Sequence, residues 1–452
     1  MHAALSNPDI LRNVFVRYCG YGYDRSDDSN YRQVDHVAQP LHTISTVCRA
    51  WRQEVLPLLH ETLEFRVSTA PIDATKAESR HVFQDVAGNY VYTNLNILDQ
   101  AAWAQIRPRH VQVEIGNGVS IEAVATLIES LQEQLKAVST TMLTELWLFG
   151  YIYDGDSASA ELRARSHAAA GRIVSAIRAV APGLSKVDFR VLDACREAIP
   201  VATILGDLTE TMTGLKIVAN AFLDWDQVSL PMVKHLEIEC SDKEGEGEII
   251  ATVPEINPTE LETLRLRHVR MSHFYQQFRN GDPSRTVIFS KLKELLLSFM
   301  SEEGDEDVTE VGEITSAYDI IYEFPVLDRI IIYNSELSLS GLFRIFAHTP
   351  VTNIWMENWY GCEDNIDLTV FPKLAYIFIN FRDCNTDDME QLPTTIRNAL
   401  KHCSELRSLS FNYVTNFDIT LPDTIASPYI ESLNFDGIMS LSDITRLATE
   451  LP

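Results

Sequence analysis

The sequence lacks both a long apolar run and a secretory leader. No stretch of about eighteen consecutive apolar residues occurs, so no membrane-spanning helix is predicted. Residues 1–6 contain no basic stretch followed by an apolar one, which argues against a secretory signal. The seven cysteines are scattered and form no Cys-x-x-Cys pair, a pattern typical of reduced thiols. We therefore expect a cytoplasmic or nuclear protein that does not contact membranes.

Motifs for catalysis, nucleotide binding and metal binding are also missing. The chain has no Gly-x-x-x-x-Gly-Lys-Ser/Thr phosphate loop and no Gly-x-Ser-x-Gly elbow. Its twelve histidines form no His-Glu-x-x-His spacing. Residues 116–118 and 154–156 match only the beginnings of a dinucleotide motif and a calcium loop, and we interpret both as turns. The sequence predicts a non-catalytic protein with no metal and no cofactor.

Positive charge is scarce. The chain has 37 Lys and Arg against 64 Asp and Glu, a net charge of −27, and residues 1–67 carry only −1 of it. Because an acidic surface repels phosphate groups, we expect neither nucleic acid nor an anionic membrane as a partner. The acidic stretches 242–248 and 302–313 are interpreted as solvated insertions, with docking sites for a basic partner as the alternative.

What the sequence does contain is an internal repeat. The pattern apolar-x-x-apolar-x-apolar occurs eleven times, and successive starts are separated by 21 to 41 residues. The last two apolar residues of a unit share one face of a short strand, and this face becomes buried only when neighbouring units stack on it. The first residues of the eleven units are Leu143, Leu184, Met212, Val233, Leu261, Leu292, Leu327, Val351, Leu374, Leu406 and Ile430.

Helical apolar spacing separates several of these predicted strands, at 162–180, 342–347 and 389–400. The alternation of strand and helix over residues 143–452 resembles the leucine-rich-repeat family, whose asparagine after the third apolar residue is matched by Asn220. The resemblance implies an α/β fold, an irregular leucine-rich-repeat horseshoe solenoid of about eleven units without an evident C-terminal cap. Residues 68–142 are expected to link to this solenoid and to cap its N-terminal side.

Residues 1–67 predict a separate small helical module. The segments Pro8-Asp9-Ile10-Leu11-x-x-Val14-Phe15 and Val47-Cys48-Arg49-x-Trp51-Arg52 precede Leu58-Leu59 and a predicted strand at 62–67. Together they resemble an F-box, with a loop insertion at residues 20–38. The resemblance implies docking on a Skp-type adaptor, and through it on a cullin, by Pro8, Ile10, Leu11, Phe15, Val47, Cys48 and Trp51. The alternative is that these helices only cap the open edge of the repeat array.

The residues that alternate with the buried strand positions predict a binding surface. They are charged in the early units, aromatic and apolar in the middle units, and small and polar in the last units. Exposed aromatic clusters are typical of binding hot spots. The alternative is that a loop or helix covers the aromatic stretch, which would make it core. We expect the partner-binding residues to be Arg265, Arg267, Ile331, Tyr333, Trp355, Tyr376 and Phe378.

Taken together, these features favour a substrate-recognition subunit of a Skp-cullin-F-box type ubiquitin ligase, which holds a protein substrate on its repeat surface. Such a receptor acts by raising the effective concentration of the substrate near the ubiquitin-charged enzyme. Two other functions fit the same sequence. One is a leucine-rich-repeat scaffold without a role in ubiquitin transfer, and the other is a regulator of a small GTPase.

Overall fold

The computed structural model describes most of the chain between residues 62 and 449. The described ranges are 62–71, 81–94, 108–137, 142–151, 159–240, 253–269, 286–299, 322–333, 346, 349–359, 367–381, 392–412, 418–419, 421–435, 438–439, 445 and 449. The seven predicted adaptor-binding residues, from Pro8 to Trp51, lie outside the described residues. The chain divides into two compact units, Met1–Met212 and Thr213–Pro452. The fold is α/β, with a large, mostly parallel sheet and few helices among the described residues.

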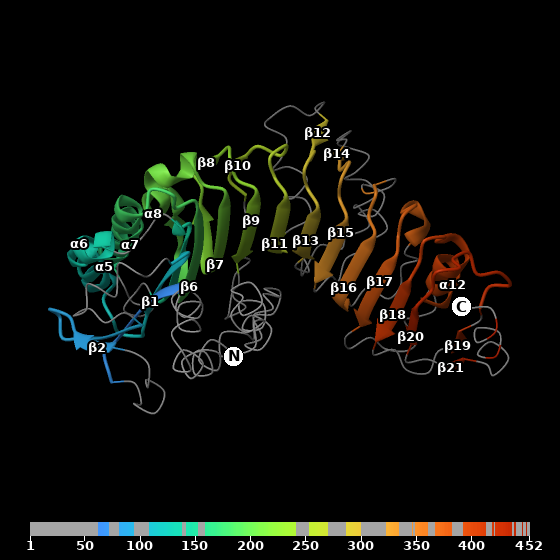
Figure 1. The fold of residues 1–452 in the computed structure, drawn as a ribbon, viewed down its shortest axis with the longest axis horizontal. Helices are drawn as coiled ribbons and strands as arrows, with labels where there is room; N and C mark the ends of the chain where they lie inside the picture. Colours follow the sequence, from blue (N-terminus) through green and yellow to red (C-terminus); the bar gives the residue numbers. More distant parts are fainter. Residues whose placement is uncertain are drawn as a thin grey trace, which may run out of the picture. The chain divides into compact units, whose positions relative to one another are not determined.

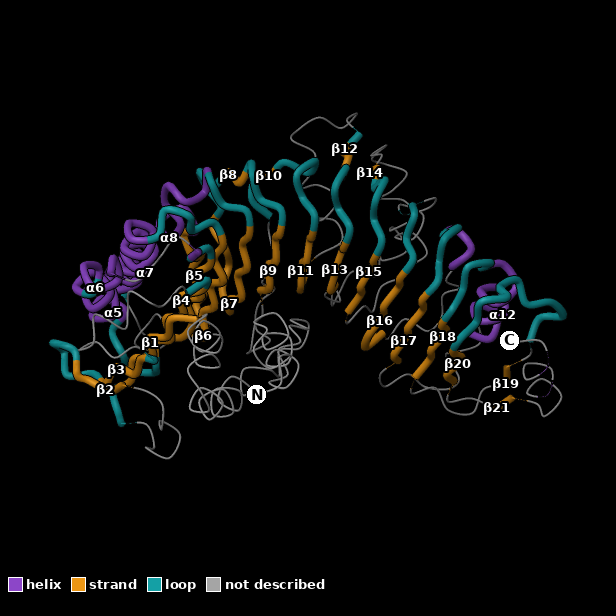
Figure 2. Tube along the Cα trace, in the orientation of Figure 1, coloured by secondary structure: helices purple, strands orange, loops and turns teal. Residues whose placement is uncertain are grey.

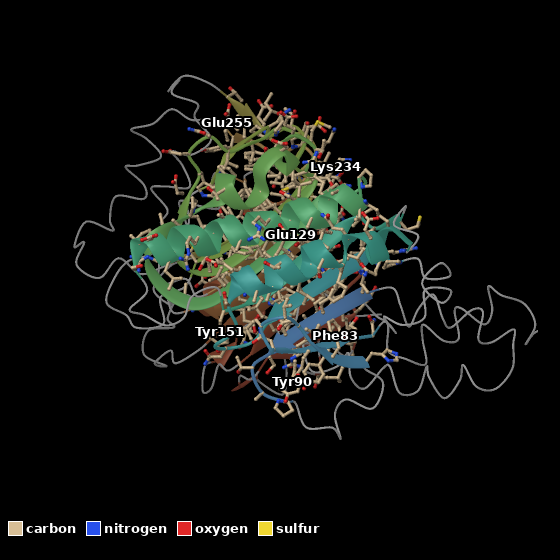
Figure 3. All side chains as sticks on the ribbon, turned by 90° about the vertical axis from the view of Figure 1, so that its left-hand side faces the viewer. Phe83, Tyr90, Glu129, Tyr151, Lys234 and Glu255 are labelled. Atoms are coloured by element: carbon tan, nitrogen blue, oxygen red, sulfur yellow. The ribbon has the colours of Figure 1, made fainter. Side chains whose placement is uncertain are left out.

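The strands of the first unit run in the order β2-β3-β1-β4-β5-β6. Their bounds are β1 Thr62–Ser68, β2 His81–Gln84, β3 Tyr90–Thr93, β4 His110–Ile115, β5 Glu145–Gly150 and β6 Lys186–Pro200. β2 and β3, which carry Phe83 and Tyr90 in Figure 3, form an antiparallel hairpin, and β3 in turn pairs antiparallel to β1. The remaining neighbours pair in parallel. The strand expected at 62–67 is confirmed, and it pairs with a strand of the segment expected to cap the repeats.

Helices back the first unit on one side of its parallel strands (Figure 1). They are α5 Ile121–Ser130, α6 Gln132–Ala137, α7 Ala160–Val180, α8 Val201–Leu205 and the 3₁₀ turn η5 Gly206–Glu210. The helix expected at 162–180 is confirmed by α7, which begins after Ser159, whose side chain accepts a hydrogen bond from the amide of Leu162. Gly171 lets α7 approach α8 closely, since a Cβ there would lie 2.3 Å from the carbonyl oxygen of Thr203.

The second unit is built from parallel strands, each paired with the next long strand along the chain (Figure 1). These strands are β7 Gly214–Asp224, β9 His235–Cys240, β11 Thr263–Val269, β13 Glu294–Phe299, β15 Arg329–Tyr333, β16 Asn353–Trp359, β17 Tyr376–Phe381, β18 Ser408–Asn412 and β20 Ser432–Phe435. Together with β5 and β6 of the first unit, they account for all eleven strands expected from the repeat.

The connections of the second unit differ from the expected alternation of strand and helix. No residue described between 213 and 333 is helical (Figure 2). Pairs of two-residue strands stand there instead, namely β8 Ser229–Leu230 with β10 Glu255–Ile256, and β12 Val287–Ile288 with β14 Tyr322–Glu323. A third pair joins β19 Asp418–Ile419 to β21 Ile438–Met439. Helical structure returns in η7 Leu368–Val370 and in α12 Leu392–His402, which confirms the C-terminal part of the helix expected at 389–400.

The repeat positions form the core. In the first ten of the eleven sequence repeats, every residue at the three apolar positions is at most 2% exposed. In the last repeat, Ile430 is buried and Leu433 is half-buried. Burial of about three aliphatic side chains per unit is worth several kcal/mol in each unit before the chain-ordering entropy is subtracted. The repeat read from the sequence is therefore the physical basis of the sheet.

One backbone hydrogen-bond pattern recurs between successive repeats. The carbonyl oxygen just before one strand accepts from two consecutive amides just before or at the start of the next. Lys234 O, for example, accepts from the amides of Glu262 and Thr263 at 2.7 and 2.9 Å. In the second unit the acceptors are Thr213, Lys234, Glu262, Lys293, Asp328, Thr352, Ala375 and Arg407. This shared acceptor fixes where each strand begins, so the strands enter the sheet in register.

A buried group of phenylalanines lies in the turns that precede several strands of the second unit. The rings of Phe289 and Phe324 stack with centroids 5.0 Å apart, and Phe346 lies 5.1 Å from Phe324. Phe371 occupies the corresponding place before β17 and is also buried. Phe289, Phe324 and Phe371 stand three places before the first apolar position of their repeats, in the segments Phe-Ser/Pro-x-Leu, whereas Phe346 stands five places before Val351. The repeat expected from the sequence omitted this fourth core position.

Candidate functional site

The sheet of the second unit has one face that packs on the repeat core and an opposite face, which we call the ladder face. Side chains of successive strands are aligned in rows on the ladder face. It consists of the residues that alternate with the buried repeat positions. Pairing places one residue of each strand in a central row, because partners in a parallel sheet lie side by side. The central row contains Lys216, Glu237, Arg265, Leu296, Ile331, Trp355, Phe378, Ser410 and Asn434.

The first part of this face is a chain of alternating charges, which we call the charged section: Lys216, Glu237, Arg265, Glu294 and Arg329. Lys216 Nζ lies 2.6 Å from Glu237 Oε1, and Glu237 Oε2 lies 3.6 Å from Arg265 Nη1. Arg265 Nη2 lies 2.7 Å from Glu294 Oε1, and Glu294 Oε2 lies 3.7 Å from Arg329 Nη1. Each charge of the section is therefore matched by an opposite charge of the same protein.

Arg265 is the centre of this section. Burial lowers the pKa of its guanidinium, but the carboxylates of Glu294 and Glu237 outweigh that cost and raise the pKa above its ordinary value. Arg267, two residues along the same strand, lies 3.5 Å from Glu239 through its Nε. Both arginines predicted to bind a partner are thus already engaged by carboxylates of their own sheet.

The predicted aromatic residues lie together on the ladder face, and we call Ile331, Tyr333, Trp355, Tyr376 and Phe378 the aromatic patch. Trp355 and Phe378 are neighbours in the central row, and their rings stack with centroids 4.1 Å apart at 26°. Stacked aromatic pairs add to stability and also expose broad apolar surface to a ligand. The patch is therefore a real cluster, drawn from β15, β16 and β17.

Exposure varies across the patch. Tyr376 is 42% exposed, while Tyr333, Trp355 and Phe378 are half-buried. Ile331 is only 6% exposed, because Leu296 and Trp355 flank it in the central row. Ile331 therefore offers little contact surface of its own, and the aromatic side chains supply the accessible area.

A carboxylate, Glu357, lies inside the aromatic patch. It pairs in register with Tyr333, and its Oε2 accepts a hydrogen bond from Trp355 Nε1 at 3.3 Å. Burial raises the pKa of the Tyr333 hydroxyl, and the nearby charge of Glu357 raises it further. The guanidinium of Arg267 lies over the Tyr333 ring, 5.5 Å from its centroid, as a cation–π contact. Sequence reasoning missed Glu357, although its alternation with Trp355 in residues 353–357 could have indicated it.

The last strands of the ladder face carry small polar side chains. Ser408 pairs with Ser432, and Ser410 pairs with Asn434. Asn434 Nδ2 donates to Ser410 Oγ at 3.4 Å. The expected order of charged, aromatic and small polar side chains along the face is therefore confirmed for the described residues.

The first unit has its own cluster on the corresponding positions of β4 and β5. His110 stacks on Trp147 with ring centroids 5.0 Å apart, and Trp147 Nε1 donates to Glu145 Oε1 at 2.6 Å. His110 Nε2 lies 3.6 Å from Glu145 Oε2, and both residues are buried. A buried, mutually bonded group of this kind reads as structural. The repeat pattern does not indicate this cluster, because β4 precedes the first repeat, although polar and apolar residues alternate clearly over residues 110–115.

Chemistry elsewhere in the described part of the chain is limited. Burial raises the pKa of the Cys240 thiol to about 12 and that of the Cys403 thiol to about 11, which disfavours the nucleophilic thiolate. Among the described residues, no three His, Cys, Asp or Glu side chains are grouped so that they could hold a metal ion. None of the described helices combines the length and apolar character needed to cross a membrane. No known family model matches the chain, and no curated protein sequence matches it.

Proposed function

We propose that the chain is an irregular leucine-rich-repeat receptor that holds a protein partner on its ladder face. The observation that carries this proposal is the aromatic patch, where the stacked rings of Trp355 and Phe378 lie beside the exposed ring of Tyr376. Aromatic residues gathered on an otherwise polar surface are typical of interface hot spots, where Trp and Tyr carry much of the binding energy.

Several features support the leucine-rich-repeat assignment and its horseshoe form. The core positions of successive units are buried in the same way, and the shared carbonyl acceptors repeat from unit to unit. Asn220, at the position of the family asparagine, is a buried polar residue with an exposure of 7%. Parallel strands stacked in register suit a surface that presents side chains in fixed rows, because such a scaffold changes little on binding.

We further propose that this receptor is the substrate-recognition subunit of a Skp-cullin-F-box type ubiquitin ligase and works in the cytoplasm or nucleus. Its support is the F-box resemblance of residues 1–67, above all Val47-Cys48-Arg49-x-Trp51-Arg52. The receptor itself performs no bond chemistry. It positions a substrate near the ubiquitin-charged enzyme, which raises the effective concentration of the substrate there.

Two tryptophan substitutions test the two halves of this proposal against each other. In co-purification with the Skp adaptor, Trp51→Ala is expected to lose the adaptor while the purified chain still captures its partner. Trp355→Ala is expected to do the reverse, and so serves as the matched control. Adaptor binding that survives Trp51→Ala would count against the ligase role. Partner capture that survives Trp355→Ala would count against the ladder face as the binding surface.

A further inference from the structure

Glu357 differs from the other carboxylates that face the ladder surface of the second unit. Glu237, Glu239 and Glu294 each form an ion pair with an arginine of a neighbouring strand. Glu357 instead accepts a hydrogen bond from Trp355 and lies in register with Tyr333, and no Lys or Arg of the described part of the chain forms an ion pair with it. The patch therefore contains one negative charge that the described protein does not neutralise.

A second acceptor lies next to this carboxylate. Asn380 pairs with Glu357 in the register between β16 and β17. Its side-chain oxygen is buried and has no hydrogen-bond partner in the structure. A buried acceptor without a donor costs free energy, so a donor supplied by a ligand would be favoured at this point. Glu357 and Asn380 thus form a short row of acceptors beside the rings of Trp355 and Phe378.

The chemistry that satisfies all of these groups at once is a guanidinium. It carries a positive charge that complements Glu357. Its five N–H donors lie in one plane, so it can donate to Glu357 and to Asn380 at the same time. Its flat face stacks on aromatic rings, whereas the compact ammonium of lysine does so less well. The same face already contains an internal example, because Arg267 lies over the Tyr333 ring while its Nε is 3.5 Å from Glu239.

We propose that Glu357, Asn380 and the stacked rings of Trp355 and Phe378 receive an arginine side chain of the bound protein. This inference rests on the proposed function and specifies the partner: a peptide segment that presents arginine to the aromatic patch. The net charge of −27 favours the same class of partner, since an acidic protein attracts basic segments over long range.

The test uses the full chain and a random peptide display library as the probe. Peptides are selected on the wild-type protein and counter-selected on Trp355→Ala, so that only ligands of the patch remain. In the best ligand, each arginine is then replaced by citrulline, which keeps the shape and removes the charge. On the wild-type protein, one such replacement is expected to weaken binding by about 10- to 100-fold, the range of a charge-assisted hydrogen bond.

A double-mutant cycle assigns that effect to Glu357. On Glu357→Gln, the same citrulline replacement is expected to weaken binding by less than about 3-fold, because the charge partner is already absent. Glu255→Gln is the matched control: it makes the same change at an exposed carboxylate on β10 and should leave the full citrulline effect in place.

Two other outcomes separate the inference from the proposed function. If the selected peptides depend on Trp355 but tolerate citrulline at every arginine, the arginine site is wrong and the binding surface stands. If no selected peptide depends on Trp355, both the arginine site and the patch as a binding surface are wrong. A citrulline effect that persists unchanged on Glu357→Gln overturns the assignment to this carboxylate.

Discussion

The charged section and the aromatic patch lie on the same sheet face, yet they differ in how their polar groups are satisfied. In the charged section, Arg265 lies between Glu237 and Glu294, and every charge has an internal partner. In the aromatic patch, Glu357 has no internal cation among the described residues, and Tyr376 is 42% exposed. The charges of the charged section are neutralised within the protein, whereas the aromatic patch keeps an exposed ring and a carboxylate without an ion pair among the described residues.

This difference separates two uses of the same architecture. Ion pairs across neighbouring strands hold the early strands in register and oppose misalignment, since a shift by one residue would turn a strand's charged side chains to the buried face of the sheet. Stacked rings on the later strands leave apolar area in contact with water, which a partner can cover. Stability and binding are therefore expected to depend on different parts of the ladder face.

The largest expected effect is on binding through the aromatic patch. Replacing both Trp355 and Phe378 with Ser should weaken partner capture by about 100-fold or more, because hot-spot residues of this type each contribute about 2 kcal/mol or more. The protein should stay folded, since neither side chain belongs to the repeat core. Binding measured by calorimetry and a thermal melt check both statements. A melt that shows loss of the folded state would mean that the patch is core.

The opposite result is expected in the charged section. Arg265→Met should lower the free energy of unfolding by about 1–3 kcal/mol, because it leaves Glu237 and Glu294, on the two strands that flank β11, without the arginine that they share. The range lies below that of a fully buried pair because the Arg265 side chain is 23% exposed. Urea unfolding measures the change, and peptide binding to the patch should stay within about 3-fold of wild type. A large loss of binding with unchanged stability would reverse the comparison.

The same substitution at two carboxylates sharpens the contrast. Glu294→Gln should destabilise the protein by about 1–2 kcal/mol, because Glu294 pairs with both Arg265 and Arg329. Glu357→Gln should change stability by less than about 0.5 kcal/mol, since it breaks no ion pair among the described residues. Parallel urea titrations of the two variants test this difference. Equal losses would show that the charge of Glu357 stabilises the fold as much as that of the ion-paired Glu294.

The smallest expected effect is a pH dependence at Tyr333. Burial and the charge of Glu357 raise the pKa of this hydroxyl in the folded protein. An unfolded tyrosine ionises near pH 10, so the unfolded state loses its proton first as pH rises. The stability that depends on Tyr333 is therefore present below about pH 10 and is lost above it. Tyr333→Phe should flatten this decline in unfolding curves between pH 8 and 11, and an unchanged slope would contradict it.

The repeat made much of the fold predictable. The spacing of apolar residues placed all eleven expected strands, because burial of a period-two pattern depends only on nearest neighbours in the stack. The connections were less predictable. Helices were expected between strands, but described connections in residues 213–333 use two-residue strands, as in β12 and β14. Short segments of this kind carry too little periodicity to separate strand from helix.

The binding patch was predictable in composition but not in detail. Strand alternation alone placed Trp355 and Phe378 on one face, and the register then brought them into contact. The burial of Ile331 could not be predicted from the sequence, because it depends on Leu296, which lies 35 positions earlier and becomes a neighbour only in the sheet. The role of Glu357 was missed for the same reason, since its lack of an ion pair is a property of neighbouring strands.

By itself, the sequence determined the strands, their buried faces and the order of charged, aromatic and polar sections along the ladder face. These properties are local, because side-chain alternation and apolar spacing act within each short segment. Only the tertiary structure decided which charges are matched. The ion pairs of Arg265, and the lack of one at Glu357 among the described residues, arise from the register between strands that lie far apart in the chain. That register is set by the backbone hydrogen bonds that link one repeat to the next.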